Sequence, residues 1–101
     1  MSTTKKFYEL QDLILAKMSL EKVKLHIEER KDRTIFKWVR KELTGFFRKF
    51  SNVERFRDLV NSINKGLEEE NYELILENVK RSLAIISDEI EQYYQDLQKM
   101  Q

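Results

Sequence analysis

Cysteine and proline are absent from this sequence, and glycine occurs only twice, at Gly45 and Gly66. The lack of cysteine excludes disulfides, thiolate nucleophiles and cysteine-ligated zinc or iron–sulfur sites. The lack of proline and the scarcity of glycine remove the turn residues that sandwiches and barrels need between their short strands. These absences favour a small number of long helices.

Long apolar segments are also missing, because no uninterrupted apolar run exceeds Leu13–Ala16. A helix that spans a membrane needs about 20 consecutive apolar residues. The N-terminal segment reaches Asp12 before a signal-like apolar stretch has formed. We therefore predict a cytoplasmic protein and do not expect a membrane partner.

The apolar content is nevertheless sufficient for one core, since 41% of the 101 residues are hydrophobic and 37% are charged. A chain with this many apolar residues does not belong to the disordered class, and a chain of this length builds one core of modest size. We predict a single helical domain over residues 1–101.

The net charge of +1 hides a segregation of charge along the chain. Counted in the sequence, residues 1–29 are neutral, residues 30–66 carry +7 and residues 67–101 carry −6. This layout places a basic surface beside an acidic one, or allows head-to-tail pairing between copies.

The second half of the chain predicts two helices, near residues 52–65 and 71–98. Ser51 and Glu54 have the spacing of a capping box at the start of the first helix, and Gly66 stands where a left-handed residue would end it. Asn71 is a suitable cap for the second helix.

Apolar residues recur along this last helix at steps of three and four residues, which is also the pattern of a coiled-coil seam. Its C-terminal part extends past the region that two shorter helices can cover. A homodimer through the C-terminal helix, around Tyr93 and Leu97, is therefore a further prediction.

Two interpretations remain open for the first half. Apolar residues at helical spacing predict helices near residues 5–29 and 34–50. The alternation of apolar Val23, Leu25 and Ile27 with polar residues fits instead a strand, in a hairpin at about 22–39. That hairpin lacks an Asn-Gly or Asp-Gly turn and would form an isolated ribbon of marginal stability. We therefore predict an all-α antiparallel four-helix bundle with a long C-terminal helix, with an α+β fold as the alternative.

The segment 34–50 contains the only tryptophan, Trp38. On a helical wheel, seven of its eight bulky apolar residues share an arc of about 120°, whereas Trp38 lies about 160° from Phe36. Gly45 lies on the same side as Trp38 and leaves a gap beside the indole. The simplest interpretation is a half-exposed residue of no special role.

The other interpretation is a binding surface, because tryptophan and arginine are enriched at interface hot spots. We predict that Trp38 anchors a protein interface and that basic residues surround it: Lys37, Lys41, Arg48 and Lys49. The alternative is a nucleic-acid-binding accessory protein, in which the same side and three further cations contact phosphates: Arg30, Lys31 and Arg33.

Residues for catalysis or for metal binding are scarce. His26 is the only histidine and has no serine motif around it. Glu69, Glu73 and Glu77 share a helix face, but the Glu-x-x-His motifs of bundle metal sites are absent. No glycine-rich phosphate loop occurs. We predict a non-catalytic interaction or regulatory protein with no metal and no cofactor.

Overall fold

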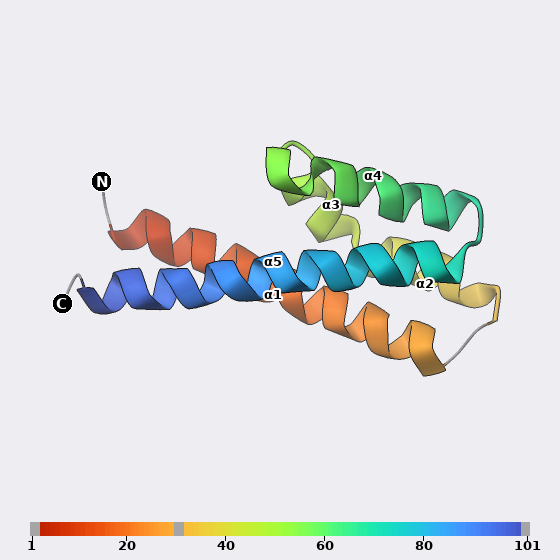
Figure 1. Cartoon of the computed structure of the whole chain (residues 1–101), viewed down its shortest axis with the longest axis horizontal. Coiled ribbons are helices and arrows are strands. Elements are labelled where there is room, and N and C mark those ends of the chain that lie inside the picture. The colour runs from red at the N-terminus through yellow and green to blue at the C-terminus, as the bar shows by residue number, and fades with distance from the viewer. Residues whose placement is uncertain (1–2, 30–31, 100–101) are drawn as a thin grey trace.

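The structure is a computed structural model that describes residues 3–29 and 32–99, in which helices are joined by short turns (Figure 1). The five helices in these ranges are α1 (Thr3–Glu29), α2 (Thr34–Glu42), α3 (Thr44–Phe50), α4 (Glu54–Glu68) and α5 (Tyr72–Lys99). The predicted all-α class and the long C-terminal helix are confirmed.

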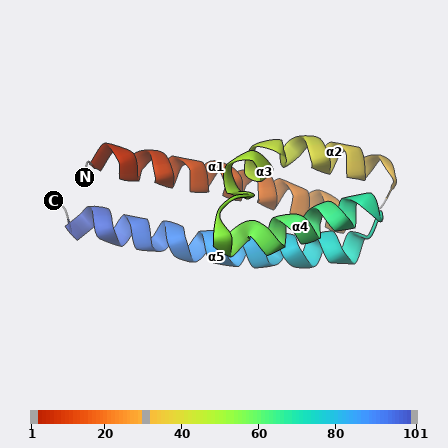
Figure 2. The same ribbon diagram turned by 90° about the horizontal axis from the view of Figure 1, so that it is seen from above.

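α1 and α5 form a long antiparallel pair, and α4 packs along α5 (Figures 1 and 2). α2 and α3 cover α1, and α3 also reaches α4. The molecule measures 48 × 25 × 18 Å. It is elongated because the first part of α1 and the last part of α5 run on together beyond α2, α3 and α4 (Figure 2).

The core lies where all five helices meet. Phe46 and Phe50 of α3 pack against Phe56 of α4, with ring centroids 6.2 and 5.1 Å apart. The two long helices supply fully buried aliphatic side chains to the same cluster: Leu20 and Val23 from α1, and Ile75, Val79 and Ile86 from α5. Burial of such side chains contributes about 1.5–3 kcal/mol each to folding.

The alternative hairpin at residues 22–39 is wrong. Residues 22–29 belong to α1 and residues 34–39 belong to α2. Val23 and Ile27, one helical turn apart, are buried, whereas Leu25 between them is 52% exposed. A strand would direct all three to the same face. The alternation in the sequence arises because Leu25 is an apolar residue on the outside of a helix.

The predicted helix at 34–50 is divided, so the expected number of four helices is also wrong. The division falls at Leu43, which is fully buried and has φ −91° and ψ 6°. The hydroxyl of Thr44 donates to the carbonyl of Arg40 over 3.0 Å, and Gly45 follows. Both residue types weaken a helix, and α3 leaves the direction of α2 (Figure 1).

The predicted caps have opposite outcomes. The capping box of Ser51 and Glu54 is wrong, because Ser51 ends α3 and extended Val53 precedes α4, which has no side-chain cap. The cap at Asn71 is confirmed, since its Oδ1 accepts a hydrogen bond of 3.1 Å from the N–H of Leu74.

Gly66 lies inside α4 and not after it. α4 ends in a Schellman motif, in which the N–H of Asn71 donates to the carbonyl of Gly66 over 2.8 Å. Glu70, with φ 52°, takes the left-handed position that the sequence analysis assigned to Gly66. Gly66 is needed for a different reason. α5 packs directly on it, so that an added Cβ would lie 2.7 Å from Cγ1 of Ile75.

Replacing each glycine with alanine tests this close approach. Both substitutions gain about 1 kcal/mol of helix propensity, but Gly45 has open space where a Cβ would lie. We expect Gly66→Ala to have the lower free energy of unfolding by about 1–3 kcal/mol relative to Gly45→Ala, as measured by urea denaturation. Equal stability of the two variants would contradict the contact between α4 and α5.

Candidate functional site

Trp38, the predicted anchor, is half-buried on α2 and packs against His26 of α1. The two ring centroids are 4.5 Å apart and the planes meet at 69°, an edge-to-face contact. The rings line a surface hollow of about 270 Å³ with Thr34 and Ile35. The indole therefore keeps an accessible part, while the imidazole covers one of its sides.

α2 carries three cations, of which Lys41 and Lys37 lie about 60° and 100° from Trp38 around the helix and Arg40 lies about 160° from it. Lys37 and Lys41, two of the predicted binding residues, are exposed, and so is Arg40. Within residues 3–29 and 32–99, no carboxylate forms an ion pair with any of the three. Their charge is available to a ligand.

The two predicted binding residues on α3 are separated from Trp38 by the break at Leu43. Arg48 is exposed and lines a different hollow, between α3 and the middle of α1. Lys49 pairs with Asp12 of α1 over 2.7 Å. Gly45 lines the hollow of Arg48 and not that of the indole, and open space lies where its Cβ would be. One wheel placed these residues on one side because it assumed an unbroken helix.

Of the three further cations of the nucleic-acid alternative, Arg33 immediately precedes α2. Arg30 and Lys31 lie outside the described residues. Arg33 makes a two-armed ion pair with Glu70, with both N–O distances 2.9 Å. The hydrogen bonds of this pair raise the pKa of Arg33 and lower the pKa of Glu70. The pair ties the start of α2 to the turn between α4 and α5.

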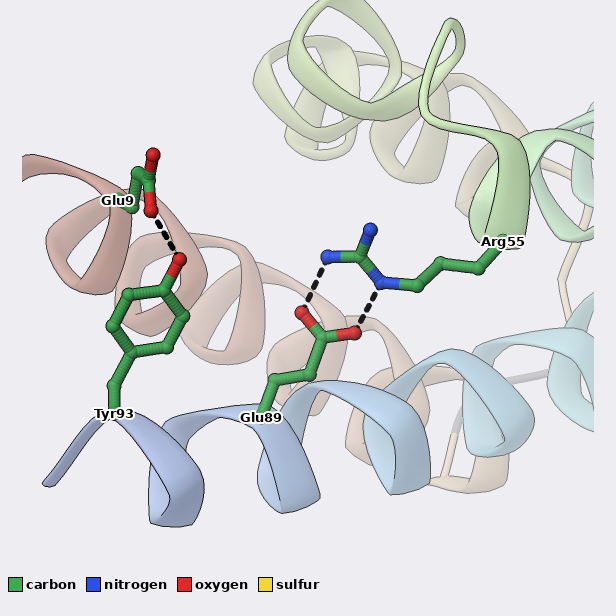
Figure 3. A network of polar contacts seen from close by, with 4 residues as sticks. All are labelled: Glu9, Arg55, Glu89 and Tyr93. Atoms are coloured by element: carbon green, nitrogen blue, oxygen red, sulfur yellow. Dashed lines mark hydrogen bonds and ion pairs between the residues drawn. The ribbon is translucent and has the colours of Figure 1, made fainter. Parts of the chain in front are cut away.

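A polar network that the sequence did not predict lies where α1 and α5 begin to extend beyond the other helices (Figure 3). The hydroxyl of Tyr93 on α5 donates to the carboxylate of Glu9 on α1. Arg55 of α4 binds Glu89 of α5 through two nitrogens. The partners in each pair are far apart in sequence, so no spacing rule could have found them. Together they join α1, α4 and α5 at one level.

Burial, with a smaller effect from the hydrogen bond to Glu9, raises the pKa of Tyr93 to about 12. Tyr93 and Leu97 pack against the core of their own chain. Their position in the C-terminal seam is thus occupied by α1, and a homodimer through them stays a prediction.

His26 and the acidic side chains are the candidates for catalysis and for metal binding. His26 contacts the indole, and its Nδ1 lies 3.3 Å from the carbonyl oxygen of Lys22. Over residues 3–29 and 32–99, no three acidic or histidine side chains gather in a way that could hold a metal. In the same ranges, every buried polar side-chain atom has a hydrogen-bond partner, and no helix combines the length and apolar character needed to cross a membrane.

The fold and this surface define the protein only as a helical protein with a basic, tryptophan-containing α2. No known protein family, curated protein sequence or solved structure matches the chain. Any function must therefore be argued from these side chains.

The packing of Trp38 predicts a change in its fluorescence. We expect His26→Ala to increase acrylamide quenching of the only tryptophan and to move its emission to longer wavelength, because water replaces the imidazole. His26→Phe is the matched control, since a phenyl ring retains the cover and should keep quenching near the wild-type value. Identical quenching in all three proteins would contradict the ring contact.

The raised pKa of Tyr93 predicts a pH dependence of stability. The folded-state pKa of about 12 exceeds the ordinary value of 10.0, so this tyrosine stabilises the fold below pH 10 and loses that contribution as the pH rises toward 12. We expect the free energy of unfolding to fall less steeply over this range in Tyr93→Phe than in the wild type. Tyr94→Phe, which removes the neighbouring exposed hydroxyl, should retain the wild-type slope. A wild-type slope in Tyr93→Phe would oppose this assignment.

Proposed function

We propose that this chain is a non-catalytic interaction protein that binds an acidic surface of a partner protein through α2. Trp38 is the anchor, with Lys37 and Lys41 beside it. Arg48 on α3 lies apart from this surface, over the middle of α1, and Lys49 contributes little because Asp12 neutralises it. The observation that carries the proposal is a half-exposed indole on a helix whose cations have no anionic partner among residues 3–29 and 32–99.

The physical argument begins with the unpaired charges. All three basic residues of α2 are exposed and unpaired among the described residues, whereas Arg33, Lys49 and Arg55 on either side are held by carboxylates. An acidic partner supplies the missing carboxylates, which speeds association and selects the partner. The indole then contributes affinity, because a tryptophan that becomes fully desolvated is the commonest kind of hot spot.

The contact with His26 supports the anchor role. An aromatic side chain held in one orientation before binding loses less conformational freedom when a partner arrives. Trp38 meets this condition because α1 covers one of its sides while the hollow lined by Thr34 and Ile35 stays open. A partner side chain of modest size fits beside the indole.

A nucleic-acid-binding accessory function is the second candidate, and the same unpaired cations favour it. The indole could stack on a base while the cations contact phosphates. This candidate loses Arg33, which the two carboxylate oxygens of Glu70 already occupy. The protein-binding function is therefore the better supported of the two.

Affinity capture from a lysate of cells that express the protein tests the proposal, with and without nuclease. We expect nuclease-resistant capture of a partner protein. Trp38→Ala should raise the dissociation constant of that purified partner by about thirtyfold, mainly through faster dissociation. The double substitution Lys37→Glu and Lys41→Glu should slow association.

The matched control is Tyr94→Ala, which removes an exposed aromatic ring on α5, and it should bind as the wild type does. Capture that disappears with nuclease, together with binding that weakens steeply between low and moderate salt, would favour the nucleic-acid candidate. Wild-type affinity in Trp38→Ala would refute the anchor role.

A further inference from the structure

α1 carries two apolar faces, and the bundle covers only one of them. Its buried face consists of Leu10, Leu13, Ala16, Leu20, Val23 and Ile27. On the opposite side Phe7, Leu15, Met18 and Leu25 are between 48% and 55% exposed. Large apolar side chains gathered on an exposed helix face mark an interaction surface. The outward face of α1 is thus a surface that lacks its cover.

The outward residues follow the spacing of a helix seam. At 100° per residue, Phe7, Ile14, Met18 and Leu25 fall within an arc of about 40°. Three of them are about half exposed, and Ile14 is partly buried against the core. Gln11 and Glu21 occupy the two intermediate positions, so that the steps alternate between four and three residues. These six residues form the outer seam of α1.

The outer seam is complementary to itself in the antiparallel direction. Two antiparallel seams centred at the level of residue 16 along the helix axis produce three kinds of layer: Phe7 with Leu25, Gln11 with Glu21, and Ile14 with Met18. Each layer then occurs twice, once on each side of a two-fold axis. We propose that a second copy of this chain packs antiparallel on the outer seam of α1 and forms a symmetric dimer.

The polar layer points to protein as the occupant of this seam. In the dimer the side-chain amide of Gln11 donates to the carboxylate of Glu21 of the second copy. Insertion of this face into acyl chains would bury the carboxylate of Glu21 without a hydrogen-bond donor, which is costly. The same layer fixes the register, since a shift by one turn separates the two polar groups.

The edges of the seam fit the same arrangement. Leu15, which is 48% exposed, lies beside the axis and meets Leu15 of the second copy. Tyr8, which is 64% exposed, lies at the level of Lys22 of the second copy and offers its ring to the ammonium group. On the other edge, Lys17 lines a hollow with Glu21, whose carboxylate one turn away offsets the repulsion between the two copies of Lys17.

The exposed area is of the size that a modest dimer needs. Five large side chains are about half exposed or more: Phe7, Tyr8, Leu15, Met18 and Leu25. They present roughly 500 Å² per copy, taking on the order of 200 Å² for a fully exposed large side chain. A standard interface buries about 800 Å² per partner. The stems of the flanking polar residues add to the apolar area, so we expect a dissociation constant in the micromolar range.

This dimer differs from the one predicted through Tyr93 and Leu97, which pack within their own chain. It also leaves the α2 surface of the proposed function to other ligands, because no residue of α2 belongs to the outer seam.

Sedimentation equilibrium of the full chain between about 1 and 100 µM tests the proposal. We expect a monomer–dimer equilibrium, and at least a tenfold rise in the dissociation constant for Met18→Glu and for Leu25→Glu. Both side chains are half exposed, so circular dichroism and the thermal midpoint should stay near wild type and exclude unfolding as the cause. The matched control is Tyr94→Glu, which places the same charge on an exposed aromatic position of α5 and should leave the dimer intact.

Single cysteines test the direction of the pairing, since the natural chain has none. A short bis-maleimide should join two copies of Leu15→Cys. It should not join two copies of Tyr8→Cys, because antiparallel packing places these positions roughly 20 Å apart along the axis. Cross-linking at both positions would indicate a parallel pair and overturn the proposal.

Three other results would overturn it as well. The first is a wild-type chain that stays monomeric up to about 100 µM. Binding of this monomer to vesicles of anionic phospholipid would assign the outer seam to a lipid surface instead. The second is a dimer that Met18→Glu and Leu25→Glu leave intact. The third is a dimer that Tyr94→Glu dissociates, which would assign the interface to α5.

Discussion

The antiparallel packing of α1 on α5 is the contact on which the rest of the structure depends. These are the two longest helices, and their paired length sets the 48 Å dimension of the molecule. α2, α3 and α4 are shorter, and they pack against this pair over only part of its length. The polar network around Tyr93 and Arg55 lies at the boundary between the two halves, where water begins to reach the inner side chains (Figure 3).

The break at Leu43 separates Trp38 on α2 from the cations of α3. An unbroken helix over residues 34–50 would place Trp38, Arg48 and Lys49 on one side. Because the chain changes direction after Glu42, the phenylalanines of α3 turn toward Phe56 and the core closes beneath them. The basic surface is thereby divided, with one part around the indole and the other part over the middle of α1.

Two surfaces of this small protein have different physical character. The α2 surface combines an indole with unpaired positive charge and suits an acidic partner, whereas the outer seam of α1 is apolar and suits a copy of itself. If both proposals hold, the dimer presents two α2 surfaces. A partner with two acidic sites would then bind more tightly than one site allows, since the second contact forms at a high effective concentration.

The sequence by itself determined the features that depend on neighbours within one or two helical turns. The all-α class, the extent of α5 and the cap at Asn71 follow from spacing and from local hydrogen bonding, and all three were predicted correctly. The mistaken expectations share a cause, which is packing between helices. Gly66 has its role only because Ile75 packs on it. Ser51 lies at the end of α3 and does not begin α4.

Only the tertiary structure decided which apolar face of α1 is buried. Phe7 and Met18 resemble core residues in sequence, yet they are exposed because α5, α2 and α3 approach α1 from the other sides. The contact of Trp38 with His26, and that of Tyr93 with Glu9 across 84 positions, likewise depend on how whole helices are placed. A periodic pattern indicates that a helix has an apolar face. Which apolar faces are buried depends on how all the helices pack around one core of limited size.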